Sequence, residues 1–190
     1  FEEVEAAMML ENVTQMTSGR ITGSVLAPEK QTELEKSQSY VIFQLGGEHY
    51  ALEVLRVQEV LDMGALTHVP GAPNSLRGVL NLRGHVVPVW DLRIPFGLPV
   101  DSSISRAPCV LMVESNVGEQ VRVTGLLVDR VSDVLEFPND SIQPSPPMGL
   151  GKASSYVRGL IRWQESFLLV LDVDRVFISL MNLSNAGGGF

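Results

Sequence analysis

The sequence predicts a mainly all-β protein in which two equivalent β lobes are accompanied by only short helices. Short apolar runs separated by Gly- or Pro-containing turns follow one another from residue 40 onward. Windows with the 3.6-residue period of an amphipathic helix are scarce. Two segments of the chain recur, in the same order, further along the sequence. These three observations favour small β-barrels over an alternating α/β sheet.

Paired apolar runs predict four β-hairpins along the chain. The pairs span residues 40–54, 79–92, 108–128 and 156–173. Gly46-Gly47 lies between the runs of the first pair, where a tight hairpin turn needs residues of this kind. Pro88 interrupts the second run of the second pair, which predicts an edge position or a bulge at that strand.

Helices are predicted at only two places, near residues 73–76 and near residues 174–181. Pro144, Pro146 and Pro147 predict an irregular loop between the two lobes. Most of the regular structure is therefore expected to be sheet.

The internal repeat supports the two-lobe interpretation. It pairs LRVQEVL (55–61) with DRVSDVL (129–135), and residues 77–96 with residues 158–177. Gly78 and Gly159 follow an arginine in both copies, so we expect these glycines to serve a bend or a close backbone approach. Val89 and Val170 occupy equivalent positions, and both are expected to face a barrel interior.

Arg83 is a candidate binding residue because only the first copy has it. The turn of the first copy reads Asn81-Leu82-Arg83-Gly84, and the second copy reads Arg162-Trp163-Gln164-Glu165. Both sequences can turn, so the arginine is not needed for turning. An arginine at the tip of a hairpin suits contact with another protein. A solvated turn residue is the alternative.

Composition limits the classes of function. The 190 residues are 45% hydrophobic, with a net charge of -8 and a pI near 4.8. This charge disfavours non-specific binding to nucleic acid or to an anionic membrane surface. No apolar stretch is long enough to span a bilayer, and direct membrane insertion is not expected. The single cysteine, Cys109, excludes an internal disulfide and fits a reducing cytoplasm.

The ends of the chain differ in composition from its middle. Residues 1–36 hold seven acidic and three basic side chains, and much of this segment is rich in Ser, Thr and Gly. We therefore predict an acidic, disordered tail over residues 1–38, one domain of two interleaved lobes over 39–183, and a flexible C-terminus over 184–190.

The sequence contains no pattern that predicts catalysis, a metal site or a cofactor. His49, His68 and His85 are scattered without the spacing of metal ligands. Asp172 and Asp174 would share one face of a strand, but no third oxygen ligand lies near them in sequence. A nucleophile elbow and a phosphate-binding glycine loop are also missing from the sequence. We expect the protein not to be an enzyme.

Three stretches together resemble the CheW-like domain family of bacterial chemotaxis coupling proteins. They read FQLGGEHYALEVLRVQEVL, PNSLRGVLNLRGHVVPVWDLR and LLVDRVSDVL, and the resemblance covers about residues 39–180. It implies two five-stranded β-barrels around a shared hydrophobic core. It also implies a non-catalytic adaptor that joins the cytoplasmic tips of chemoreceptors to the regulatory domain of a CheA-type histidine kinase. The acidic tail, Trp90 and Trp163 depart from the family pattern.

The resemblance also implies a receptor-binding site. Arg83 and Gly84 match the receptor-contacting turn of the family, and four valines match its apolar groove: Val57, Val60, Val110 and Val131. Such a groove would accept a helical hairpin tip. Ordinary core packing is the alternative for each valine. Glu59 and Asp133 are expected to be solvated acids, with a partner contact as their alternative.

The implied setting is the cytoplasm, at receptor arrays on the inner face of the membrane. Other CheW-like domains are a further class of implied partner. Two other interpretations of the chain stay open. It is a CheW-like module of a larger signalling protein, or it is a small cytoplasmic β-barrel enzyme.

Overall fold

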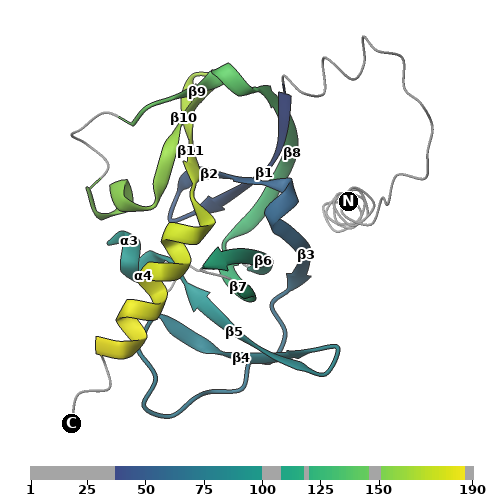
Figure 1. The fold of residues 1–190 in the computed structure, drawn as a ribbon, viewed down its shortest axis with the longest axis vertical. Helices are drawn as coiled ribbons and strands as arrows, with labels where there is room; N and C mark the ends of the chain where they lie inside the picture. The colour runs from purple at the N-terminus through teal and green to yellow at the C-terminus, as the bar shows by residue number, and fades with distance from the viewer. Residues whose placement is uncertain (1–36, 100–107, 118–119, 146–150, 187–190) are drawn as a thin grey trace.

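The computed structural model describes residues 37–99, 108–117, 120–145 and 151–186, which form two β-sheets and a few short helices (Figure 1). The strands are β1 (Ser37–Leu45), β2 (Glu48–Glu53), β3 (Val57–Asp62), β4 (Leu76–Leu82), β5 (His85–Asp91), β6 (Cys109–Val117), β7 (Gln120–Val128), β8 (Arg130–Pro138), β9 (Ile142–Gln143), β10 (Val157–Trp163) and β11 (Ser166–Leu171). The helices are η1 (Val54–Arg56), α3 (Arg93–Phe96), η2 (Asn139–Ser141), η3 (Gly151–Ser155) and α4 (Val173–Ala186). The predicted fold class is confirmed.

Each lobe contains strands from both halves of the chain. Lobe A is the sheet with the order β8-β1-β2-β11-β10-β9, and lobe B is the sheet with the order β3-β6-β7-β5-β4. The hairpin β1–β2 lies in lobe A, but the chain then crosses to lobe B at β3. The hairpin β6–β7 lies in lobe B, and the chain then crosses back at β8 (Figure 1). The lobes are therefore interleaved, and neither could form from one half alone.

The four predicted hairpins are present, as β1–β2, β4–β5, β6–β7 and β10–β11. The repeat also has a clear structural counterpart. Most of its first segment lies in β3 and β8, and its second segment covers the hairpins β4–β5 and β10–β11 with the helical residues that follow each of them. In both hairpins the strand register shifts at the repeated glycine, between Leu76 and Gly78 and between Val157 and Gly159.

Both repeated glycines lie against neighbouring backbone. A Cβ atom added to Gly78 would lie 2.6 Å from the Thr67 carbonyl oxygen, and one added to Gly159 would lie 2.6 Å from the Gln143 carbonyl oxygen. Real Cβ atoms do not approach an oxygen this closely. The predicted close approach at both glycines is confirmed, so this shared feature of the two copies is structural.

Two expectations about local structure are wrong. Residues 73–76 form a turn closed by a bond from the Leu76 N–H to the Pro73 carbonyl at 2.9 Å, and not a helix. The helix α3 begins at Arg93 instead. The loop that begins at Pro144 leads from β9 towards η3 and β10, so it connects parts of lobe A and does not link the lobes.

Pro88 is not at a sheet edge, because β5 lies between β4 and β7. The predicted alternative, a bulge, lies next to it, where the register shifts between the pairs Leu76–Trp90 and Gly78–Val89. The residue opposite Pro88 in the hairpin is Val79. The Val79 N–H donates to the Thr67 carbonyl at 2.9 Å, and the Val79 carbonyl accepts the Thr67 N–H at 2.8 Å. The pairing of β5 with β7 begins only at Val89. An internal strand therefore tolerates this proline, because neither neighbouring strand pairs with its nitrogen.

Side chains that alternate along the strands form three hydrophobic clusters. The largest is shared by the two lobes and includes Phe43, Tyr50, Trp90 and Leu126. A second cluster fills lobe A around Val170, and a third fills lobe B around Val89. Val89 and Val170 are both fully buried, as the repeat predicts. The shared cluster explains why the lobes form one unit.

The helix α4 closes the shared core. Its buried side chains, Val173, Val176, Phe177 and Leu180, recur at helical spacing. Asp172 precedes the helix, and its carboxylate accepts the Arg175 N–H at 3.1 Å, as an N-cap residue does. Elements extend beyond the predicted 39–183 domain, because β1 begins at Ser37 and α4 ends at Ala186. Residues 1–36 of the predicted tail lie outside the described residues.

Candidate interaction site

The turn between β4 and β5 holds Arg83 and Gly84 in a tight two-residue connection. Arg83 has φ 52° and Gly84 has φ 88°, so both central residues are left-handed. Two left-handed central residues are the mark of a type I′ turn, whose backbone twist matches that of the two flanking strands. The Asn81 side-chain oxygen accepts the Gly84 N–H at 2.9 Å and stabilises the turn. The hairpin therefore presents Arg83 from a well-supported backbone.

The equivalent turn of lobe A clarifies the role of the arginine. Gln164 occupies the position of Arg83 between β10 and β11 and has nearly the same φ, 54°. Neither arginine nor glutamine is favoured in this region, where Gly, Asn and Asp are usual. Since a different long side chain adopts the same backbone in the other lobe, the turn does not require arginine. This agrees with the interpretation of the repeat.

The Arg83 side chain is 80% exposed and makes one ion pair, to Glu59 on β3, with 3.4 Å between Nη2 and Oε2. The Glu59 side chain is only 18% exposed, so the acid lies mostly beneath the arginine. A pair this long and this exposed contributes little to stability. Most of the guanidinium donors are therefore directed at solvent.

Arg83 and Glu59 lie at the rim of an open pocket of about 320 Å³ at the end of lobe B. The other residues that line it are Gln58, Leu82, His85, Val87 and Val123. Gln58 is in turn hydrogen-bonded to the Glu114 carboxylate on β6. The pocket combines charged groups at its rim with three aliphatic side chains. A cation beside a small apolar surface suits the binding of a protein segment.

The four valines of the expected groove do not lie on this surface. Val57, Val60 and Val110 are 2%, 9% and 1% exposed. Val57 and Val60 belong to the shared core, whereas Val110 points into lobe B. Val131 on β8 is half-buried against the shared core. Core packing, the alternative, describes all four, and the apolar part of the site comes from other residues.

The two acidic residues for which a partner contact was the alternative, Glu59 and Asp133, lie in different lobes. Glu59 lies beside Arg83, but Asp133 is on β8, the outer strand of lobe A. The Asp133 carboxylate accepts the N–H of its neighbour Val134 at 2.9 Å. The structure therefore brings Arg83, Gly84 and Glu59 together and leaves Asp133 and Val131 outside the site.

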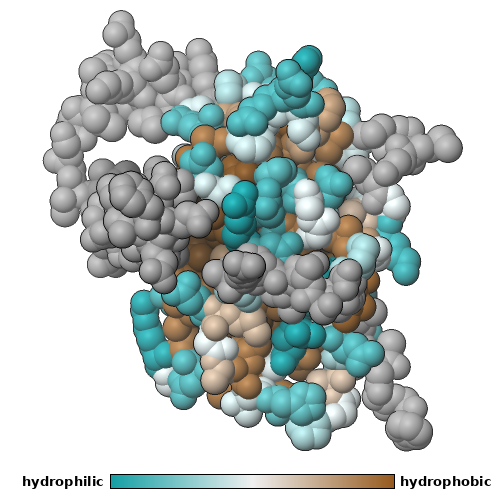
Figure 2. Space-filling view, turned by 180° about the vertical axis from the view of Figure 1, so that it is seen from behind, coloured by the Kyte–Doolittle hydropathy of each residue, from teal (hydrophilic) through white to brown (hydrophobic). Residues whose placement is uncertain are grey.

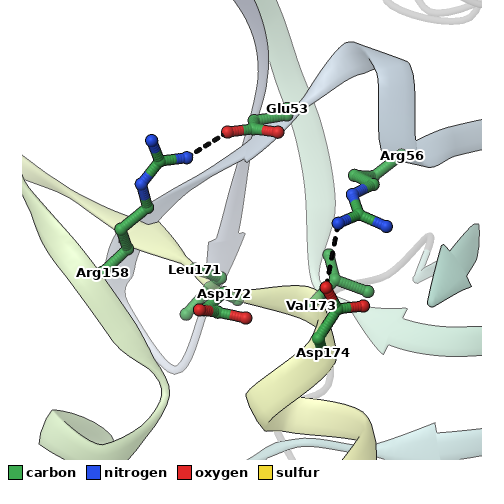
Figure 3. A pocket seen from close by; sticks show the side chains of 7 residues that line it. All are labelled: Glu53, Arg56, Arg158, Leu171, Asp172, Val173 and Asp174. Carbon is green, nitrogen blue, oxygen red and sulfur yellow. Dashed lines mark hydrogen bonds and ion pairs between the residues drawn. The ribbon is translucent and has the colours of Figure 1, made fainter. Parts of the chain in front are cut away.

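A second pocket, of about 160 Å³, lies where β2, β10 and β11 meet the start of α4 (Figure 3). Its charged groups are paired with one another. Arg158 is bonded to Glu53, and Arg56 contacts Asp174 at 2.9 Å. Asp174 also accepts the Asn116 N–H from β6 at 2.7 Å. These bonds tie the start of α4 to both lobes, which is a structural role.

The same bonds argue against a cation site at Asp172 and Asp174, because cations of the protein already hold both carboxylates. Asp172 contacts the Arg175 side chain at 3.3 Å, and Asp174 contacts Arg56. Within the described part of the chain, no group of three or more His, Cys, Asp or Glu residues is placed to hold a metal ion.

A buried ionic cluster was not anticipated from the sequence. Arg93 is bonded to the fully buried Asp91 and, at the β7–β8 junction, to Asp129. Asp129 also accepts the Gly46 N–H at 2.7 Å. The cluster connects both lobes at the start of α3. The sequence hinted at a structural role for Asp91 only through its match with Asp172 in the repeat. It could not predict the cluster, because strand patterns do not reveal which charged side chains are buried together.

Cys109 lies in the shared core, as expected for a small buried residue. Burial raises the pKa of its thiol to about 11. The thiol is therefore protonated at neutral pH, which does not suit a nucleophile.

The surface seen from behind in Figure 2 shows separate brown hydrophobic patches among teal polar side chains. Exposed apolar side chains include Val86 on β5 and Phe167 on β11, at equivalent places in the two hairpins. None of the helices that the structure describes is both long and apolar enough to cross a membrane.

Known proteins are similar to this chain in sequence and in fold. The sequence model of the CheW-like domain family matches residues 39–181 of this chain. Chemotaxis protein CheW of Klebsiella aerogenes is 34% identical over 142 residues, which cover 75% of this chain and 82% of that protein. Chemotaxis protein CheW of Rhizobium meliloti is 31% identical over 140 residues, which cover 73% of this chain and 86% of that protein.

A solved structure agrees with the sequence comparison. The crystal structure of the scaffolding protein TtCheW from Thermoanaerobacter tengcongensis superimposes with a TM-score of 0.63 at 29% identity. The superposition covers 71% of this chain and 88% of that one. The family match spans most of the described residues and includes both lobes and the Arg83 turn. The chain belongs to the CheW-like domain family.

Proposed function

We propose that this protein is a non-catalytic adaptor in bacterial chemosensory signalling. It couples the cytoplasmic tips of chemoreceptors to the regulatory domain of a CheA-type histidine kinase. It acts in the cytoplasm, at receptor arrays on the inner face of the membrane. Membership of the CheW-like domain family and the names of its relatives support this role.

The observation that carries the proposal is the placement of Arg83. Its side chain is 80% exposed and makes one weak ion pair, of 3.4 Å, with Glu59. Its backbone has a φ of 52°. The other lobe forms the same turn with glutamine, so an exposed arginine here points to a requirement other than stability. Arginine is enriched at the centres of protein interfaces. The Arg83 turn and the adjoining pocket are therefore the receptor-binding site.

The test replaces Arg83 by alanine and by glutamate. Arg83→Ala should change the free energy of unfolding by no more than about 0.5 kcal/mol, as is usual for an exposed site. It should weaken binding of a purified chemoreceptor cytoplasmic fragment by about 1–3 kcal/mol, the range of an interface hot spot. Arg83→Glu should weaken binding further, because it also places a second acid beside Glu59. Calorimetric titration and thermal melts measure the two quantities.

Gln164→Ala is the matched control, since Gln164 occupies the same turn position in lobe A at φ 54°. It should leave receptor binding unchanged. Binding of the kinase regulatory domain should be much less affected by Arg83→Ala than receptor binding, because the kinase uses other surfaces. If Arg83→Ala and Arg83→Glu bind the receptor fragment like the unchanged protein, the proposed site is wrong. If they unfold the domain, the arginine is structural.

A further inference from the structure

His85 lies in the same pocket as Arg83. It is the first residue of β5, opposite Leu82, and its side chain is exposed. Alternation along the strand puts it on the same face as Val87, and both residues line the pocket. Within the described residues, the imidazole has no hydrogen bond or ion pair to another side chain. Its ring nitrogens are therefore free to bind a partner.

The other two histidines are placed differently. His49 contacts the Gln44 side chain, with 2.7 Å between nitrogen atoms, and its ring lies edge-on to Trp163 at 5.5 Å. His68 is exposed in the connection between β3 and β4 and does not line the pocket. His85 alone of the three combines an exposed ring with a pocket that already contains an exposed cation.

The charges that face His85 come from three elements. Arg83 lies in the turn next to it, Glu59 lies across the pocket on β3, and Glu114 on β6 is held behind Gln58. From β7 the pocket receives only the aliphatic Val123. When it is protonated, the ring adds a second positive charge at the rim, next to the guanidinium. The apolar floor of Leu82, Val87 and Val123 lies between these donors and the barrel interior.

We propose that His85 is a second partner-contacting residue, which holds an acidic side chain of the bound segment together with Arg83. A neighbouring apolar side chain of the same segment packs on Leu82 and Val123, which are only partly buried. A carboxylate is the group that two adjacent nitrogen donors recognise best. This inference rests on the proposed function, because it names the chemistry of the partner at the proposed receptor site.

A pH series with the chemoreceptor cytoplasmic fragment tests the inference. Histidine is the side chain that gains its charge as pH falls from 8 to 6. Binding by the unchanged protein should become about two- to fivefold tighter over this range, as an exposed charge pair allows. His85→Val should abolish the increase, so that it weakens binding more at pH 6 than at pH 8. His85→Lys, a permanent cation, should bind tightly at both pH values.

His68→Val is the matched control, and it should keep the full pH dependence. Thermal melts at both pH values check that each variant is folded. If His85→Val binds more tightly at pH 6 to the same extent as the unchanged protein, the inference is wrong. If Arg83→Glu weakens binding in that same experiment, the receptor site itself stands. If Arg83→Glu also binds normally, the proposed function of the pocket fails as well.

Discussion

Gly159 offers a clean test of the close approach that both copies of the repeat share. In Gly159→Ala the new Cβ would lie 2.5 Å from Ile142 Cγ2 and 2.6 Å from the Gln143 carbonyl oxygen. The oxygen belongs to the backbone of β9, which is paired with β10, so relief requires the strands to separate. Overpacking of this kind costs about 1–3 kcal/mol.

The expected change in thermal midpoint follows from the size of the chain. For a protein of this length, 1 kcal/mol corresponds to a shift of about 2–4 °C. Gly159→Ala should therefore lower the midpoint by about 2–12 °C. Gly78→Ala should cost more, about 2–6 kcal/mol, because it adds backbone strain at φ 150° to a contact of 2.6 Å.

Gly64→Ala is the control for the same chemical change. No atom lies within 4 Å of its would-be Cβ, and its φ lies outside the left-handed region. Alanine there should leave stability unchanged or raise it slightly, because it restricts the unfolded chain. Circular dichroism melts and urea titrations of the three variants give the comparison. If Gly159→Ala is as stable as Gly64→Ala, the two strands do not approach as closely as the structure has them.

Two further predictions concern the core. Val89→Asp and Val170→Asp should each unfold the protein, because each buries an unpaired carboxylate in a different lobe, and a soluble, folded variant would contradict the assigned cores. Cys109 should react slowly with a thiol reagent at pH 8 in the folded protein and quickly in urea, because burial raises its pKa to about 11; rapid labelling of the folded protein would refute this.

Some features of the fold followed from local patterns. The four hairpins were predictable because each is formed by neighbouring runs joined by a short turn, as in β1–β2 with its Gly46-Gly47 connection. The helix α4 was predictable from its apolar spacing. Residues 73–76 were mistaken for a helix, and α3 was missed, because one turn of helix contains too few residues for a periodic pattern.

The family resemblance implied a binding turn at Arg83, which the structure shows to be exposed, and a groove of four valines, of which Val57, Val60 and Val110 are buried. Matching strands cannot tell which face of a sheet is buried when both faces are apolar, as in β6, where Val110 faces lobe B and Leu111 faces the shared core. His85 was discarded as a scattered histidine, since its place in the pocket depends on β3 and β7.

The sequence by itself determined the fold class, the duplication and the presence of a tight turn at Arg83, because these depend on residues close together along the chain or on comparison of its two halves. Only the tertiary structure decided that the lobes exchange strands, that Arg93 is buried between Asp91 and Asp129, and that Glu59 lies beneath Arg83. Apart from the local Asp91–Arg93 pair, these contacts join segments tens of residues apart, whose approach is set by burial of the shared core rather than by any local pattern.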